Sequence, residues 1–478
     1  MFLLRTAGMF LPPNLKELLH KNYVQHVFLF AVILGLIAIA YWPTMTANYA
    51  FADDYYCLWN RLYQQNWLRE IITEGILQAR PLNGTLVAIL MTGCKSLNDY
   101  ISFHALTIFE TAILAYLICC FLVWYGWTKL QGCFLALSLC SLPPFQVIHC
   151  WAVITFFVLS SIFAMLAVMC VVSGNLKIPQ HSMQRMILAF IFLLLAITIY
   201  QPWAMFYWVG VAIYFANKLV SDKQRYIYLA KFTAIFLAVA LVDLLLLKIA
   251  ITYLKDIPVS PERTHLTTHI LQKISWFFSG PLVDALNFNH LMVSNEIALF
   301  SGLFIIIGLW LHFNIKNRWQ SLLNLSIALA FIPLSYLPNL AISESYYTYR
   351  TEFGLSALLL FYAYLSAGAF LKKWQEKSER LSMIVFTAII TVTGIYNLIS
   401  AHNHVIDFFV KPQMYELNLL KAQLRGDFGK ARQLHPFYFE RKDTIAPFNR
   451  HDEFGMPSFA CSWIRDPGTI VLKGEINN

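Results

Sequence analysis

Residues 27–56 read VFLFAVILGLIAIAYWPTMTANYAFADDYY, and this stretch indicates the architecture of the whole chain. Its first part is an apolar run that, taken as residues 24–43, has about the 20 residues a helix needs to cross a bilayer. A polar stretch containing Arg5 and Lys16 precedes this run. A cleavable signal peptide would have a shorter basic region and a small-residue cleavage site, so we expect an uncleaved first span.

The composition of the chain is that of a membrane protein. The sequence is 58% hydrophobic and only 13% charged, and its mean hydropathy is +0.58. A water-facing surface needs more charge than this, whereas a bilayer does not, so a soluble globular protein is excluded. The net charge of +9 comes from short basic clusters between apolar runs, a pattern that retains loops in the cytoplasm. Since no basic stripe is interleaved with aromatic residues, nucleic-acid binding is also excluded.

The apolar runs predict an all-α polytopic membrane protein with about eleven transmembrane helices. The runs lie near residues 24–43, 103–125, 131–148, 152–172, 187–201, 203–220, 229–252, 295–313, 320–338, 351–371 and 380–400.

Charge alternation between the runs predicts the topology. If the N-terminus is cytoplasmic, Lys129 is cytoplasmic only when the mixed segment 82–97 does not cross, so we expect an interfacial helix there. The first loop, 44–102, and the second, 253–294, are then periplasmic. The chain divides into a transmembrane domain over residues 1–400 and a small periplasmic region over 401–478, and the loops gathered on one face mark it as the functional side.

The adjacent carboxylates Asp53 and Asp54 follow the first span closely. Two acids beside low-dielectric surroundings can have their pKa values pushed apart, which would leave one as a general base. Asp is also a favoured N-cap, and the pair could simply open a helix over residues 55–68. The residues alone leave both interpretations open.

Arg80-Pro81 opens the predicted interfacial helix. An Arg beside a helix start is suited to a phosphate group. The alternative is an Arg that anchors the helix at the lipid headgroups.

The loop over residues 343–352 holds Glu344, Glu352, Arg350 and three tyrosines between two spans. Such charges are costly beside hydrocarbon unless they are paired or hydrated, so they favour a functional role. The loop 253–294 is basic although it is periplasmic, and an anionic lipid phosphate would account for its charge.

Two further features of the chain carry less specific signals. His265 and His269 have helical metal-ligand spacing but no accompanying acid, so we assign no metal site. Asp452 and Glu453 sit in a turn, DEFGMPS, for which a surface position is the default expectation.

The order of these motifs resembles that of the GT-C superfamily of polytopic glycosyltransferases. An acidic motif in the first outer loop is followed by interfacial helices and a basic motif, and here Asp53-Asp54 and Arg80-Pro81 occur in that order. The sequence ADDY at residues 52–55, the loop with Glu344, Tyr349 and Arg350, and the turn at 452–458 look most like the phage-type serotype-converting O-antigen glucosyltransferases.

This resemblance implies an enzyme of the bacterial inner membrane. It would move a hexose, most naturally glucose, from a polyprenyl-phosphate carrier to O-antigen on the periplasmic side, with a companion flippase and a donor-making synthase as partners. The polyprenyl-phosphate sugar would be the donor substrate, and no cofactor or divalent cation is supported by the sequence. The implied roles are a general base for Asp53, positioning of donor or acceptor for Asp54, carrier-phosphate binding for Arg80, Arg350, Lys255 and Arg263, and substrate contacts for Tyr55, Glu344, Tyr349, His265, Asp452 and Glu453.

Two alternatives stay open at this stage. The first is another GT-C activity, such as mannosyl or aminoarabinosyl transfer to protein or lipid A. The second is a flippase or transporter of lipid-linked sugars. A flippase would tolerate loss of the Asp53 carboxylate, whereas a base-dependent transferase would lose about 10²-fold or more of its activity.

Overall fold

The computed structural model describes residues 23–172, 182–253, 265–314, 317–374, 378–426, 453–461 and 463–477. Secondary structure in these ranges is almost entirely helical, apart from an isolated antiparallel bridge between Leu266 and Ile342. The longer elements, in chain order, are α3 (Tyr23–Thr46), α4 (Asp53–Tyr63), α5 (Trp67–Leu77), α6 (Pro81–Met91), α7 (Tyr100–Trp124), α8 (Lys129–Leu139), α9 (Pro143–Cys150), α10 (Phe157–Val172), α11 (Ser182–Ile199), α12 (Gln201–Ala204), α13 (Phe206–Ala216), α14 (Asp222–Tyr253), α16 (Ile270–Ser279), α17 (Pro281–Leu286), α18 (Asn295–Phe313), α19 (Arg318–Leu334), α20 (Leu337–Ala341), α21 (Phe353–Trp374), α22 (Glu379–Val405), α23 (Lys411–Gly426) and α25 (Arg465–Asn477).

The helices confirm an all-α polytopic membrane protein. In the described ranges, seven helices are long and apolar enough to cross a bilayer, and an eighth crossing results if the bent pair α8 and α9 forms one span. Large apolar side chains on the outer faces of α3, α14, α18 and α22 are exposed, as expected for helices that face lipid.

Each of the eleven predicted apolar runs contains a helix, but several of these helices are short. α11 has 18 residues, α19 has 17, α10 has 16, α8 and α13 have 11 each and α9 has 8. Every residue of α13 is buried, so its apolar composition reflects a place at the centre of the bundle. At 1.5 Å per residue α13 is about 16 Å long, roughly half the hydrocarbon thickness. The number of crossings therefore stays a prediction.

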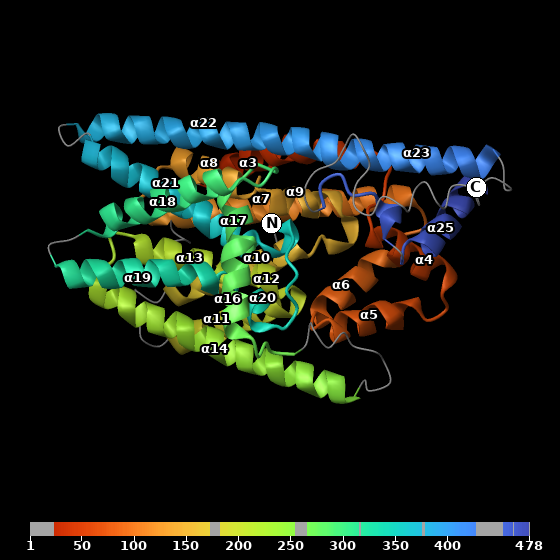
Figure 1. Ribbon diagram of the computed structural model, residues 1–478, viewed down its shortest axis with the longest axis horizontal. Coiled ribbons are helices and arrows are strands. Elements are labelled where there is room, and N and C mark those ends of the chain that lie inside the picture. Colours follow the sequence, from red (N-terminus) through yellow and green to blue (C-terminus); the bar gives the residue numbers. More distant parts are fainter. Residues whose placement is uncertain are drawn as a thin grey trace.

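The elements expected to carry function gather at one end of the bundle. Figure 1 shows α4, α5, α6 and α25 together at the right, beside the end of α23. The segment expected at 82–97 forms α6, whose 11 residues are too few to span a bilayer.

The expected boundary at residue 400 falls inside a long helix. α22 continues through one π-helical stretch, Ile406–Val410, into α23. The C-terminal region therefore begins as a rigid extension of a spanning helix, and α23 carries it to the end of the molecule where α4 lies.

Candidate functional site

Asp54 is buried within the backbone that surrounds it. Its Oδ2 accepts hydrogen bonds from the amides of Phe51 (2.9 Å) and Ala152 (3.2 Å), and its Oδ1 accepts one from the amide of Val153 (2.9 Å). Burial raises the pKa of this carboxyl to about 7, against the lowering effect of the three backbone donors. With both oxygens occupied and no exposed surface, Asp54 ties the loop after α3 to the segment before α10 and does not face a substrate.

Asp53 differs from its neighbour because it remains partly exposed. It is the first residue of α4, and its Oδ1 accepts a hydrogen bond of 2.8 Å from the indole N–H of Trp463. The residue before it, Ala52, has a φ of 45°, a left-handed conformation that costs energy for a residue with a side chain. The hydroxyl of Ser458 accepts a hydrogen bond from the Ala52 amide (2.9 Å) and helps to hold this turn.

The capping interpretation of the acid pair is therefore only partly right. Both acids lie in the first turn of α4, which ends at Tyr63 rather than near 68, but the N-cap is Ala52 and no side chain caps the helix. Asp54 instead reaches back to Phe51. The Asp54 carboxylate is therefore structural, whereas the Asp53 carboxylate remains accessible.

A tight hairpin between α5 and α6 places Arg80. Gly75 and Gly84 meet at the crossing of the two helices, where a Cβ on Gly75 would lie 2.7 Å from the Cα of Gly84. Ala79 adopts a φ of 58° in the connecting turn, and its carbonyl accepts a hydrogen bond from Gln201. As a result, the guanidinium of Arg80 lies over the ring of Tyr200, with its Cζ 4.4 Å from the ring centroid.

Arg350 approaches the same region from the loop before α21. Its Nε lies 3.5 Å from Oε1 of Glu453, and its guanidinium stacks over Trp151 at 4.6 Å from the ring centroid. Burial alone would lower the pKa of Arg350, but the nearby Glu453, with smaller contributions from Tyr200 and Asp53, raises it above its ordinary value. The Arg350 side chain is 23% exposed, so it is oriented by its contacts yet still accessible.

The tail turn at 453–458 is a buried part of the site, and the default expectation of a surface turn is wrong. Glu453 and Phe454 are 3% and 0% exposed. Glu416 on α23 accepts hydrogen bonds from the amides of Ser458 (2.9 Å) and Phe459 (3.0 Å). Because α23 holds the turn, Glu453 reaches Arg350 and the Ser458 hydroxyl reaches the turn before Asp53.

These contacts bring together four of the expected residues: Asp53, Arg80, Arg350 and Glu453. Glu74 lies within electrostatic range of both Asp53 and Arg80, and burial is the main reason that its pKa is raised. Arg350 in turn lies within range of Asp53. An accessible carboxylate within electrostatic range of Arg350, with Arg80 on the other side of Glu74, could remove a proton from one ligand while the arginines balance negative charge on another.

Other expected residues lie elsewhere. Tyr55 and Tyr349 are in the packing beneath the site, against Phe459 and Phe454 respectively. His265 pairs through its backbone with Ser343 on a second loop cluster (2.9 Å).

Glu344 belongs to that second cluster. Its carbonyl and that of Asn339 accept hydrogen bonds from the ammonium of Lys273, which also lies over Trp276. The remaining three predicted residues, Lys255, Arg263 and Asp452, lie outside the described residues.

Sequence reasoning gave no role to Trp151, Tyr200 and Trp463, and it placed Glu352 in the charged loop without indicating that it would be buried. Glu352 is fully buried, and neither of its carboxyl oxygens has a hydrogen-bond partner within the described ranges. Burial raises its pKa well above the ordinary range, and the nearby Asp284 and Glu453 raise it further. The sequence shows that a glutamate follows Arg350 by two residues, but only the tertiary packing shows that this side chain is buried.

Comparisons with known proteins were made at the level of family, sequence and structure. No family model, curated protein or solved structure matches the chain. Within the described ranges, no group of three or more His, Cys, Asp or Glu side chains could hold a metal ion. Function therefore has to be inferred from the side chains that the fold brings together.

Proposed function

We propose that this protein is an inverting glycosyltransferase of the GT-C type. In this proposal it lies in a bacterial inner membrane with about eleven crossings, a cytoplasmic N-terminus and a periplasmic C-terminus. It moves a hexose, glucose by resemblance, from a polyprenyl-phosphate carrier to O-antigen. The observation that carries the proposal is that Asp53 lies within electrostatic range of Arg350, which belongs to a distant loop, and of Glu74, which is itself within range of Arg80.

The reaction would be a single displacement at the anomeric carbon. Asp53 accepts the proton of an acceptor hydroxyl as that oxygen forms a bond to the anomeric carbon. The bond between that carbon and the phosphate oxygen breaks, and polyprenyl phosphate leaves with the electron pair. The proton on Asp53 then passes to water, which restores the carboxylate.

The arginines suit the leaving group. A phosphate monoester that departs with an extra negative charge needs positive charge more than it needs a proton donor. Arg350 uses Nε for Glu453, so its terminal nitrogens are the atoms that would meet the phosphate. Arg80 reaches the site from the α5–α6 hairpin, above Tyr200.

Asp53→Asn in membrane vesicles tests the proposal. With radiolabelled polyprenyl-phosphate glucose and O-antigen-bearing lipopolysaccharide, we expect the variant to transfer label at least about 10²-fold more slowly than the wild type. Asp407→Asn is the matched control, because Asp407 is a half-exposed carboxylate already paired with Lys411. If Asp53→Asn transferred label at the wild-type rate, the proposed mechanism would be overturned and a flippase would be favoured. Parallel assays with polyprenyl-linked mannose and aminoarabinose would identify another donor.

A further inference from the structure

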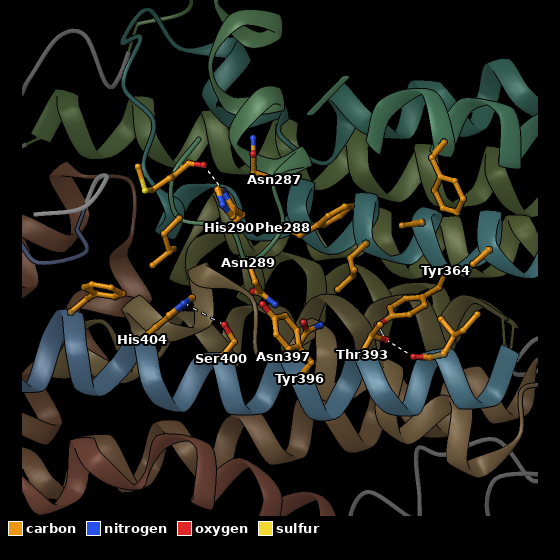
Figure 2. Close-up of a pocket in the computed structure, with 18 residues that line it drawn as sticks. Asn287, Phe288, Asn289, His290, Tyr364, Thr393, Tyr396, Asn397, Ser400 and His404 are labelled. Atoms are coloured by element: carbon orange, nitrogen blue, oxygen red, sulfur yellow. Dashed lines mark hydrogen bonds between the residues drawn. The ribbon is translucent and has the colours of Figure 1, made fainter. Parts of the chain in front are cut away.

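A lateral groove of about 650 Å³ lies between α21, α22 and the loop that joins α17 to α18. This volume is within the range of small-molecule sites in proteins. Figure 2 shows α22 along one side of the groove, with the loop carrying Asn289 and His290 opposite. The groove belongs to helices that span the membrane, and it is separate from Asp53 and the arginines.

The outer end of the groove is polar. Asn289 extends from the loop toward α22, where Tyr396 and Asn397 lie (Figure 2). Oδ1 of Asn289 is buried and has no hydrogen-bond partner within the described ranges. The preceding residue, Phe288, has a φ of 53°. An unpaired buried acceptor beside strained backbone is expected where a ligand completes the hydrogen bonding.

The inner end of the groove is mainly apolar. It is lined by Phe304, Leu360, Ala363, Ala367 and Ile389, and the two hydroxyls there, of Tyr364 and Thr393, are hydrogen-bonded to each other at 2.7 Å. Ala367 is 14 residues beyond Phe353, the first residue of α21, and therefore roughly 21 Å along that helix. The groove thus changes from amides and hydroxyls at the membrane surface to hydrocarbon within the bilayer, which is the polarity profile of a lipid molecule.

The polar end holds no Lys, Arg, Asp or Glu among the described residues that line the groove. Its two histidines are His290, whose ring contacts the carbonyl of Met292, and His404, whose ring contacts Gln146 and Ser400. A phosphate headgroup would be poorly balanced there, in contrast to the two guanidinium groups of the catalytic region. Asn, Ser and Tyr side chains instead offer the neutral donors and acceptors that match sugar hydroxyls.

We propose that this groove binds an uncharged saccharide carried on a lipid, with the sugar at Asn289 and Asn397 and the hydrocarbon beside Ala363. This proposal goes beyond the transferase function and does not depend on it. The position is nevertheless significant, because His404 and Phe408 line the groove and their rings also contact Phe454, the neighbour of Glu453. A saccharide bound at the outer end would lie close to the catalytic region.

The probe for this site is monoglucosyl diacylglycerol in phosphatidylcholine nanodiscs, with an equal amount of phosphatidylglycerol as the charged competitor. Native mass spectrometry of the released protein would report which lipid is retained. We expect the glucolipid to be enriched, and Asn397→Ala to reduce its retention about 5–10-fold by removing one hydrogen-bonding group.

Ala363→Trp would fill the apolar part of the groove. Ala369→Trp is the matched control, because Ala369 is half-buried on the same helix but does not line the groove. Loss of glucolipid in the first variant and retention in the second would support the site. Equal retention of both lipids, preference for phosphatidylglycerol, or insensitivity to both Ala363→Trp and Asn397→Ala would overturn it. Asp53→Asn should keep the glucolipid, so failure of this proposal is distinguishable from failure of the transferase proposal.

Discussion

The indole N–H of Trp463 donates a hydrogen bond of 2.8 Å to Oδ1 of Asp53, a residue 410 positions earlier in the chain. The contact leaves more than half of the tryptophan surface exposed. It fixes the orientation of the one carboxylate in the ADDY motif that a substrate can reach. Trp463 is therefore a positioning residue for the proposed base.

Trp463→Phe should lower kcat about tenfold and leave KM nearly unchanged. Phenylalanine keeps an aromatic ring but cannot donate the hydrogen bond, so the carboxylate loses its fixed orientation, and even small misplacements of reacting groups are costly. Steady-state kinetics of sugar transfer in detergent would check this. Trp319→Phe, at a tryptophan that is 82% exposed on α19, is the control and should behave as wild type. An unchanged kcat in Trp463→Phe would show that Trp463 does not position Asp53.

Asp54→Asn should lower stability as well as activity. The asparagine amide would point an N–H group at a backbone donor, which leaves at least one of the amides of Phe51, Ala152 and Val153 without an acceptor. A buried unsatisfied donor costs about 1–3 kcal/mol. Thermal unfolding of the purified protein would show the loss, and unchanged stability would mean that these hydrogen bonds contribute nothing.

The stability difference between wild type and Asp54→Asn should also depend on pH. Burial raises the pKa of Asp54 to about 7 in the folded protein, from 3.8 for the free group. The folded state therefore holds a proton that the unfolded state releases between these values, and the stabilising contribution of Asp54 falls as pH rises from about 4 to 7. Asparagine has no such titration. When unfolding is measured from pH 4.5 to 8, the stabilities of the two proteins should converge as pH rises. A constant difference across this range would contradict the raised pKa of Asp54.

Glu453→Gln should reduce transfer about tenfold. The substitution removes the negative charge that orients Arg350 against Trp151, while keeping a side chain of the same size. Asp407→Asn removes a comparable charge from an ion pair with Lys411, in which both side chains are about half exposed. Exposed pairs contribute little, so that control should retain full activity. Equal effects of the two substitutions would mean that the Arg350 pair has no special role.

Gly84→Ala should disrupt the α5–α6 hairpin. A Cβ at this position would lie 2.9 Å from the Cα of Gly75, which requires the helices to separate and costs about 1–3 kcal/mol. Because Arg80 lies in the connecting turn, transfer activity should fall with stability. Gly93→Ala is the control, since the nearest atom to its new methyl group would be 3.8 Å away. A fully active Gly84→Ala protein would show that the role of Arg80 does not depend on the packing of the hairpin.

Local sequence signals predicted part of this architecture. Apolar runs located helices because a bilayer demands long hydrophobic segments, and Arg80-Pro81 marked the start of α6 because proline fits the first turn of a helix. The same signals do not decide whether α13 crosses the membrane, since a fully buried helix has the composition of a spanning one whatever its length.

The candidate site was less predictable because its contacts join distant parts of the chain. The residues named from motifs included Asp53, Arg350 and Glu453, but nothing local indicates that Glu453 would be buried against Arg350. That pairing depends on α23, which positions the tail through Glu416. Trp463 lies in no motif at all, and its partner becomes evident only from the folded chain.

The docking of the tail beside Asp53 has a consequence for biogenesis. Trp463 is synthesised 410 residues after Asp53, so the proposed site cannot be complete until translation has passed Trp463 and the segment that carries it has reached the same side of the membrane as the first loop. A nascent or prematurely terminated chain would therefore insert into the membrane without processing lipid-linked sugars. Synthesis of the segment that carries Trp463 would then itself be the step that completes the proposed site.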